Sequence, residues 1–189
     1  PVLDASWARV KKVKRDYVLS IHMHPHKGGD IFRAIAKEMP DVEFVGLSHK
    51  LKEPEREGNL TLLPWQSDMQ HIYEHAGALV QATVCEEAFC RAVPEALGNG
   101  IPCIVSSQGN LPWFAKKFPE MVSVVDLELK EAGNPHPKNK DAHYQGRFCD
   151  TDIRQWVKAV KAALKMKKPK RHDDVWDWGV DNTVKALED

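Results

Sequence analysis

Residues 79–107 constrain the fold of this chain more than any other stretch. Their sequence, LVQATVCEEAFCRAVPEALGNGIPCIVSS, predicts an apolar strand at 79–82, a polar turn, a short helix from about Arg91, a Gly-Asn-Gly stop and a second apolar strand at 101–105. This order is that of a βαβ unit. The free N–H groups at the start of such a helix point beyond the strand ends, so the turn at 88–90 is a candidate phosphate-binding site.

The rest of the chain repeats this alternation of strand and helix. Short apolar runs bounded by turn residues predict further strands at 16–21, 42–47, 60–63 and 121–125. Helices are expected at 30–39, from an N-cap at Ser67 to about residue 76, at 111–118, from a cap at Asp150 or Thr151 to about residue 166, and at 173–187. Strands and helices of these lengths make right-handed crossovers, so we predict an α/β fold with a doubly wound parallel sheet of about six strands.

Length and composition predict the domain organisation. The 189 residues fit one domain of ordinary size. Residues 1–15 contain a basic run and little periodicity, and we expect them to be a linker or the tail of a missing upstream domain. Residues 16–189 would form one Rossmann-like domain that includes the C-terminal helices. Residues 127–148 contain two prolines and predict a long polar connection.

Composition also excludes several classes of partner. Lys plus Arg and Asp plus Glu both number 27, so no net charge attracts nucleic acid or an anionic membrane. No apolar run is long enough for a transmembrane segment, and no signal-peptide pattern is present. The four cysteines lack metal-binding or disulfide spacing, which favours a reducing compartment. We therefore expect a cytoplasmic protein that is peripheral to a membrane only through the missing domain.

Two glutamates mark the central unit. Glu87 and Glu95 have seven residues between them, Phe89 follows the first, and Gly-Ile-Pro at 100–102 opens the next strand. This segment resembles the donor-binding motif of family 4 glycosyltransferases of the GT-B fold, in which a Glu, a Gly-Phe-Gly turn and a Glu-Ala precede Gly-Ile-Pro. The resemblance extends over residues 16–189 and implies the Rossmann-like C-terminal half of a GT-B enzyme.

A second match lies in the turn after the first strand, HMHPHKGGD at 22–30. Gly28 and the glycine after it permit close backbone approach before a helix, and Lys27 can place a charge on a phosphate. The family usually has an Arg five residues before this Lys-Gly, where the present chain has His22. A neutral imidazole donates one hydrogen bond, whereas the charged guanidinium of Arg donates several. A bound diphosphate could, however, raise the pKa of His22 so that the imidazole is protonated.

Other family positions are kept or altered one at a time. Thr83 stands at the Ser that ends the fourth strand and would keep a hydroxyl. Cys90 replaces a Gly of the phosphate turn and adds a side chain where the backbone should approach the ligand. Trp113 replaces an acid in the turn at 108–113. Trp65 follows the third strand, where a nucleobase would lie in this fold; stacking on the base and packing against the next helix both stay open.

The resemblance implies a role for each of these residues. Lys27, His22 and the helix start would neutralise the donor diphosphate, which is the leaving group, so that no metal is required. Glu87 would orient the sugar through its hydroxyls, and Glu95 would bind both ribose hydroxyls. The candidate catalytic residues are Glu87 and Lys27, and the candidate donor-binding residues are His22, Gly28, Trp65, Thr83, Phe89, Cys90, Arg91 and Glu95.

The implied activity is that of a retaining hexosyltransferase. Its substrate would be a nucleotide-diphosphate-sugar, such as a UDP- or GDP-sugar, and it would need no cofactor. A GT-B enzyme has two domains with the active site between them. The acceptor, whether a sugar, a lipid or a protein, would therefore be bound by the missing N-terminal domain, and we expect this isolated domain to be inactive.

Two simpler interpretations of single motifs are open. On a continuous helix, Glu87, Arg91 and Glu95 would form an exposed salt-bridged ladder that contributes about 0.2–0.5 kcal/mol per pair. The alternation of His22, His24 and His26 is compatible with a metal site. However, the proline between the last two interrupts the strand and no Cys or carboxylate lies nearby in the sequence, so we predict no metal site.

Two other function classes are also open. The departures from the family motif fit a degenerate, non-catalytic module that binds a nucleotide-sugar or a protein partner. The second class is a different doubly wound enzyme, such as a sugar epimerase of related fold or a flavodoxin-like protein. The first strand is not followed by Gly-x-Gly-x-x-Gly, which argues against a dinucleotide enzyme.

Overall fold

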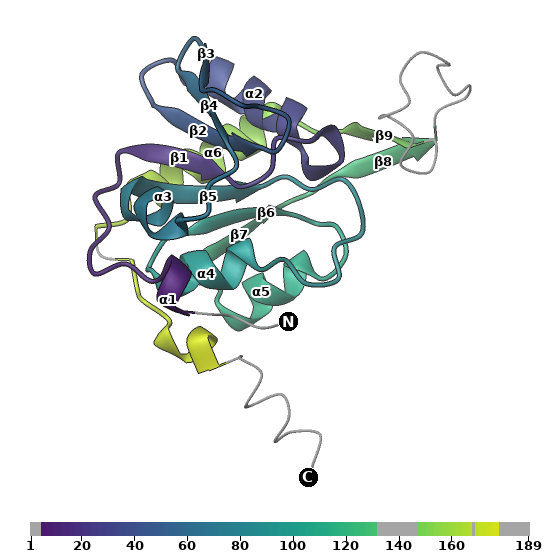
Figure 1. Ribbon diagram of the computed structural model, residues 1–189. Coiled ribbons are helices and arrows are strands. Elements are labelled where there is room, and N and C mark those ends of the chain that lie inside the picture. The colour runs from purple at the N-terminus through teal and green to yellow at the C-terminus, as the bar shows by residue number, and fades with distance from the viewer. Residues whose placement is uncertain (1–4, 132–146, 168, 178–189) are drawn as a thin grey trace.

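The computed structural model describes residues 5–131, 147–167 and 169–177 as a sheet with helices on both faces (Figure 1). Seven strands form the main sheet, and each is parallel to its neighbours except β3, which is antiparallel to β4. This arrangement confirms the predicted α/β class with a doubly wound sheet. In spatial order the strands are β3 (Glu55–Glu57), β4 (Leu60–Pro64), β2 (Phe44–Ser48), β1 (Tyr17–Ser20), β5 (Ala76–Gln81), β6 (Cys103–Ser106) and β7 (Val122–Val125).

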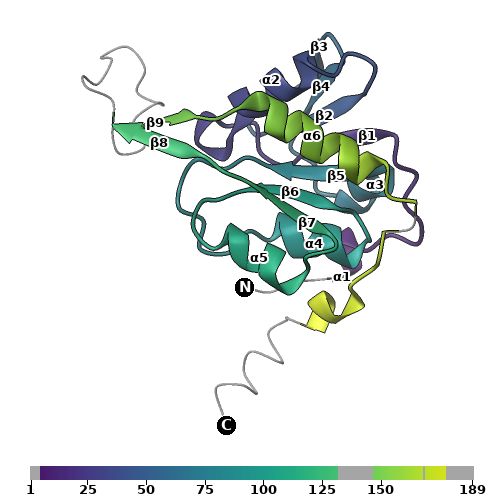
Figure 2. The ribbon, with the colours of Figure 1, turned by 180° about the vertical axis from the view of Figure 1, so that it is seen from behind.

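Two layers of helices cover the sheet. One face carries α3 (Met69–His75), α4 (Ala92–Gly98) and α5 (Leu111–Lys117). The other face carries α2 (Gly29–Lys37) and α6 (Ile153–Leu164). Figure 2, which views the molecule from behind, shows these two helices. The central strands are apolar at nearly every position because both of their faces are buried. No helix among the described residues is both long and apolar enough to cross a bilayer.

The topology decides which edge of the sheet can hold a ligand. The chain moves outward from β1 through β2 to β4 on one side, and from β5 through β6 to β7 on the other. The carboxyl ends of β1 and β5 therefore flank a topological switch point, where open α/β sheets bind ligands. Within β5, Leu79 belongs to one core and Val80 to the other, so the polar residues that follow are left to line the crevice.

Three strands were not predicted from the sequence. β3 reads Glu-Arg-Glu and is exposed throughout, so it lacks the apolar alternation of a strand and is held by its pairing with β4. β8 (Glu128–Glu131) and β9 (Arg147–Asp150) pair antiparallel as a separate two-stranded sheet. The long polar connection predicted over 127–148 therefore contains strand residues at both of its ends, which the prediction did not include.

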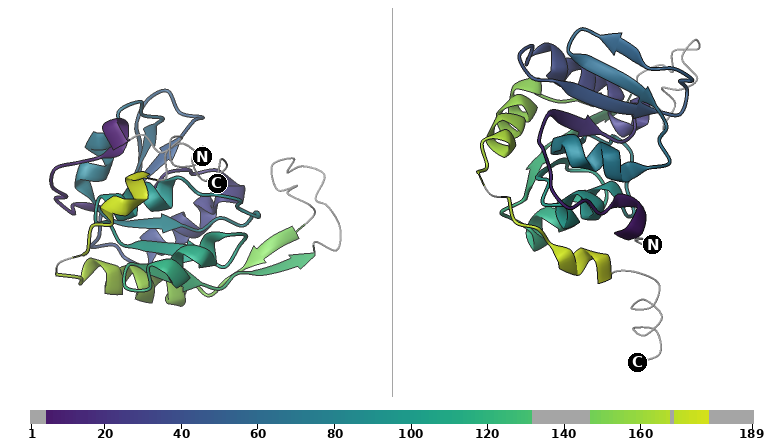
Figure 3. Two further views of the ribbon diagram at one scale, coloured as in Figure 1. Left: turned by 90° about the horizontal axis from the view of Figure 1, so that it is seen from below. Right: turned by 60° about the vertical axis from the view of Figure 1, so that its left-hand side comes forward.

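Helix ends differ slightly from the expected ones. Asp68, rather than Ser67, is the N-cap of α3 and accepts a hydrogen bond from the N–H two residues on. Asp152, rather than Asp150 or Thr151, caps α6 in the same way, since aspartate caps a helix as well as serine does. Of the helix expected at 173–187, the described part is a 3-10 helix, η3 (Asp173–Asp177), which lies against α4 (Figure 3). The remainder lies outside the described residues.

The N-terminal segment packs onto the domain. Its helix α1 (Ala5–Ala8) contacts α3, and both Ala8 and Val10 are buried. Asn99 fixes this segment, because its side chain donates to the Ala8 carbonyl at 2.8 Å and accepts from the Val10 N–H at 2.8 Å. The prediction that residues 1–15 lead to an upstream domain stays a prediction.

Candidate functional site

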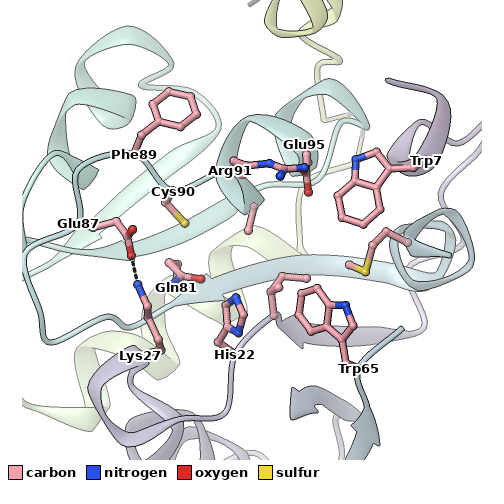
Figure 4. Close-up of a pocket in the computed structure, with 13 residues that line it drawn as sticks. Trp7, His22, Lys27, Trp65, Gln81, Glu87, Phe89, Cys90, Arg91 and Glu95 are labelled. Carbon is pink, nitrogen blue, oxygen red and sulfur yellow. Dashed lines mark hydrogen bonds and ion pairs between the residues drawn. The ribbon is translucent and has the colours of Figure 1, made fainter. Parts of the chain in front are cut away.

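A pocket of about 240 Å³ lies at the switch point, beyond the ends of β1 and β5. Figure 4 shows that its walls come from the loops after β1, β4 and β5, from the start of α4 and from α1. Most of the residues predicted from the sequence to form a site are thus brought together here. The pocket is lined by Trp7, Ile21, His22, Lys27, Trp65, Met69, Gln81, Glu87, Phe89, Cys90, Arg91, Ala92 and Glu95.

The two candidate catalytic residues form an ion pair at one end of the pocket. Lys27 Nζ lies 2.5 Å from a carboxylate oxygen of Glu87, and their side chains are 23% and 15% exposed. Burial lowers the pKa of Lys27, but the hydrogen bond and the charge of Glu87 outweigh it and raise the pKa above its ordinary value. A ligand group that binds either residue at the shared position must first open this pair.

The loop that carries Glu87 is fixed by the turn before α5. The Asn110 N–H donates to the Glu87 carbonyl at 2.8 Å. Gly109 has a φ of +57°, and a Cβ on it would lie 2.3 Å from the Glu87 nitrogen. Glycine is required because the positive φ and the close contact both exclude a side chain. Trp113, in the first turn of α5, is exposed and is not among the residues that line the pocket.

Glu95 is held inside the pocket wall rather than on an exposed helix face. It is 4% exposed, and its carboxylate accepts hydrogen bonds from the Tyr73 hydroxyl at 2.7 Å and from Arg91 at 3.3 Å. Burial raises its pKa, although Tyr73 and Arg91 oppose that shift. Glu87 precedes α4, which begins at Ala92, so the alternative of an exposed salt-bridged ladder is wrong.

An aromatic stack forms the opposite end of the pocket. The rings of His49 and Trp65 are stacked with their centroids 4.1 Å apart, and His22 stacks on Trp65 at 5.3 Å and on His49 at 5.4 Å. Trp65 remains 38% exposed, so one part of its ring surface is available to a ligand. Trp65 thus packs against two histidine rings rather than against a helical residue in the contacts seen here, and it also lines the pocket; its stacking on a base stays a prediction.

The environment of His22 disfavours its charged form. Burial, followed by the charges of His49 and Lys27, lowers its pKa from 6.5 to about 4. In the ligand-free protein His22 is therefore a neutral imidazole near pH 7. Protonation by a bound diphosphate, as considered from the sequence, would have to overcome this shift.

We expect acid to destabilise the protein partly through His22. Between pH 6.5 and about 4 the unfolded chain binds a proton at this residue and the folded chain does not, so the free energy of unfolding falls as the pH falls through this window. His22→Asn removes the titrating group. Urea unfolding at about pH 7 and about pH 4.5 should give a smaller loss of stability for this variant than for the wild type. An equal loss in both proteins would contradict the assignment.

Gly28 and Thr83 are predicted site residues that do not line the pocket. A Cβ on Gly28 would lie 2.0 Å from the Ala82 carbonyl oxygen, so the close backbone approach is to the loop after β5. Thr83 is fully buried. Its hydroxyl oxygen accepts a hydrogen bond from the side-chain amide of Gln81 at 3.2 Å, and its main-chain carbonyl accepts one from the Ser106 hydroxyl at 2.6 Å. Both residues therefore join the loops that form the pocket.

Cys90 and Phe89 fill the turn that precedes α4. Cys90 is buried, and burial together with the charge of Glu87 raises the pKa of its thiol to about 12, so the thiol stays protonated. The ring centroid of Phe89 lies 5.9 Å from that of Phe114 in α5, and Phe89 is also among the residues that line the pocket. The side chain of Cys90 thus occupies space that a glycine would leave open.

Five lining residues were not predicted: Trp7, Ile21, Met69, Gln81 and Ala92. Two of them, Trp7 and Gln81, carry polar groups. Trp7 Nε1 and Gln81 Oε1 are buried and have no hydrogen-bond partner among the described residues. The guanidinium of Arg91 lies over the Trp7 ring, 5.3 Å from its centroid. Gln81 is a single polar residue at the end of an apolar strand, a signal that could have identified it. Trp7 gives no such signal, because it lies in the segment expected to be a linker.

The three alternating histidines do not converge on one point. His22 stacks on other rings, whereas His24 and His26 lie beside each other with ring centroids 4.0 Å apart. Among the described residues, the one group with metal-ligand geometry is His71, Glu74 and His75 in α3, outside this pocket.

Comparison with known proteins bears on the fold. No protein-family model and no curated protein matches the sequence. Solved structures do match the fold. A glycosyltransferase from Rickettsia africae has 12% identity and a TM-score of 0.61, and the match covers 93% of this chain and 47% of that one. Sucrose-phosphate synthase from Thermosynechococcus elongatus has 17% identity and a TM-score of 0.57, with 92% and 41% covered.

A third similar structure contains a ligand. The Anabaena protein Alr3699/HepE, solved in complex with UDP-glucose, has 11% identity and a TM-score of 0.59, with 93% of this chain and 49% of that one covered. The chain therefore spans less than half the length of each of these three proteins. At these identities the similarity shows the fold, which is that of the Rossmann-like domains of GT-B glycosyltransferases.

Proposed function

We propose that the pocket binds the nucleoside diphosphate part of a sugar donor and that the chain is the donor-binding domain of a retaining, family 4 glycosyltransferase. The observation that carries the proposal is that two cations, two carboxylates and an aromatic platform line one pocket at the switch point. Cations suit a diphosphate, carboxylates suit the hydroxyls of ribose and sugar, and an aromatic face suits a base. The fold shared with solved glycosyltransferases supports the same function.

The positions of these groups give the donor an orientation. We place the base on Trp65, the ribose against Glu95, the diphosphate beside Lys27 and the sugar at Glu87. In Figure 4, Trp65 and Glu95 lie toward one side of the pocket and the Lys27–Glu87 pair toward the other. Gln81 lies between them, and its unpartnered oxygen can accept a hydrogen bond from the donor.

Lys27 and Glu87 would exchange partners when the donor binds. As the bond between sugar and diphosphate breaks, negative charge grows on the diphosphate, and the ammonium of Lys27 stabilises that charge more than it stabilises the ground state. Glu87, released from Lys27, accepts hydrogen bonds from sugar hydroxyls and orients the anomeric carbon. This proposal needs neither a metal nor another cofactor, because the leaving group is stabilised by protein charges.

Transfer needs an acceptor site as well. Because the chain spans less than half of the similar solved proteins, we propose that a second domain binds the acceptor. The isolated domain is then expected to bind donor without transferring the sugar.

A second function, binding without catalysis, has one specific observation in its favour. His22 stands where the family has an Arg, and its lowered pKa leaves it neutral in the ligand-free protein. The diphosphate then meets one cation fewer than in the family pattern. A module of this kind would bind nucleotide, but substitution of Glu87 would leave its biological activity intact.

Calorimetric titration with UDP, GDP and ADP tests the proposed function. One of them should bind, and Trp65→Leu should weaken that binding by about 5- to 150-fold, because stacking of a base on an aromatic ring contributes about 1–3 kcal/mol. Trp113→Leu is the matched control: both tryptophans are exposed to a similar degree, 38% and 40%, but Trp113 does not line the pocket.

The outcomes separate the alternatives. Equal affinities in the two variants would remove Trp65 from the base site. No binding of any nucleotide, both by this chain and by the protein with its second domain, would refute the donor site itself. Nucleotide binding with no transfer by the two-domain protein would favour the non-catalytic module.

A further inference from the structure

A cluster of potential metal ligands lies on the last turn of α3, away from the pocket. His71, Glu74 and His75 each offer one ligand atom, and these atoms lie within 4.8 Å of one another. Residues three and four positions apart share one face of a helix, so the three side chains point to the same region. β5 begins at Ala76, directly after the cluster, and ends at Gln81 in the pocket, so the two sites are at opposite edges of the sheet.

His75 is already oriented as a metal-binding histidine would be. Its Nδ1 lies 2.6 Å from a carboxylate oxygen of Asp16, and its ring is stacked on that of Tyr17 with a centroid distance of 6.3 Å. A carboxylate that accepts the proton of one ring nitrogen leaves the lone pair of the other nitrogen for a metal and fixes the ring plane. His75 Nε2 therefore faces the cluster, 4.0 Å from a carboxylate oxygen of Glu74.

A cation of the protein itself already occupies this region. Lys14 Nζ lies 2.9 Å from a Glu74 carboxylate oxygen and 3.4 Å from His75 Nε2. The main chain beside it is fixed, because the Lys14 N–H donates to the Glu74 carbonyl at 2.6 Å. The Lys14 side chain is 50% exposed, so the ammonium can move into solvent while the main chain stays in place. The C-terminal end of α3 also favours positive charge.

We propose that His71, Glu74 and His75 bind a divalent ion of the zinc class, with Lys14 displaced. Two imidazoles and one carboxylate are ligands that Zn²⁺ takes at about 2.0–2.2 Å, with water in the fourth tetrahedral position. The ligand atoms of such a site are roughly 3.3 Å apart. Here they lie within 4.8 Å of one another, so rotation of the side chains would bring them to the distances that the ion requires. Imidazole ligands exclude Mg²⁺ and Ca²⁺, which prefer oxygen. The sequence predicted no metal site, on the evidence of His22, His24 and His26, and the present proposal departs from that prediction at α3.

Calorimetric titration of the chelator-treated protein with ZnCl₂ tests this site. One equivalent should bind, the melting temperature should rise with Zn²⁺ concentration, and Co²⁺ should give the visible absorption of a tetrahedral site. His71→Ala should weaken binding about tenfold or more, since it removes one of three protein ligands. Lys14→Met should instead tighten it by about threefold or more, because it removes the competing cation.

The gain in the Lys14 variant makes the test specific. A change that damages the fold weakens binding, so tighter binding together with a native circular dichroism spectrum supports the site. The control is a His24→Ala, His26→Ala double variant, which removes two neighbouring histidines elsewhere and should bind Zn²⁺ as the wild type does. Unchanged affinity in His71→Ala, or unchanged or weaker affinity in Lys14→Met, would overturn the proposal.

Discussion

Lys27→Met is expected to weaken the binding of a nucleoside diphosphate by about 10- to 150-fold, because a charged hydrogen bond contributes about 1.5–3 kcal/mol. Lys27 is the less exposed of the two cations that line the pocket, at 23% against 48% for Arg91, and Figure 4 shows its ammonium directed to Glu87. Methionine keeps the length and the apolar stem of the side chain and removes only the ammonium. Titration calorimetry with the nucleotide that the wild type binds measures the loss.

The opposite result is expected for Glu87→Gln. In the ligand-free protein Glu87 holds Lys27 at 2.5 Å, so a diphosphate must compete with this carboxylate for the ammonium. Glutamine keeps the shape but not the charge. The nucleoside diphosphate should therefore bind at least as tightly as to the wild type, while sugar transfer by the two-domain protein should fall.

Unfolding measurements on the same two variants provide the control. Lys27→Met leaves the Glu87 carboxylate without its cation, so this variant is also expected to be less stable, and binding must be compared below its unfolding transition. A loss of nucleotide affinity of equal size in both variants would contradict the proposed exchange of partners. It would indicate that the ion pair has only a structural role.

Gly28→Ala is expected to cost about 3 kcal/mol of unfolding free energy. Gly28 has a φ of +82°, which disfavours any side chain. In addition, a Cβ would lie 2.0 Å from the Ala82 carbonyl oxygen, and backbone cannot move away as a flexible side chain can. The loops after β1 and β5 would have to separate, so donor binding should weaken as well.

Gly58→Ala is the matched control. Gly58 also has a positive φ, +63°, but nothing lies within 4 Å of a Cβ placed there. This variant should lose only the conformational part, about 1 kcal/mol. Urea unfolding of both variants separates backbone conformation from steric contact. Equal losses would show that the contact with Ala82 contributes nothing.

Much of the fold could be predicted because its signals are local. The apolar strand around Leu79 and the following Gly-Ile-Pro are read directly from neighbouring residues, since a strand buried on both faces must be apolar throughout. The parallel sheet then follows from the alternation of strands and helices. β3 and the β8–β9 hairpin could not be predicted, because polar strands are held by pairing with another segment and carry no apolar alternation of their own.

The candidate site divides in the same way. The positions of Lys27 and Glu87 follow from the turns of a βαβ sequence, which place side chains at strand ends, and that of Glu95 follows from the helix after the second turn. Their partners do not follow. Tyr73 reaches Glu95 from a different helix, and His49 stacks on Trp65 from a different loop, so neither contact leaves a pattern in the sequence.

The sequence alone therefore determined the class of fold, the edge of the sheet that carries the pocket and most of the residues that line it. Only the tertiary structure decided their chemical states. It buried His22 so that it is neutral, paired Lys27 with Glu87, and brought Trp7 from the N-terminal segment to the pocket wall. Composition and periodicity report on each segment by itself, whereas pKa values, ion pairs and pocket walls depend on which distant segments come to lie within a few ångströms of one another.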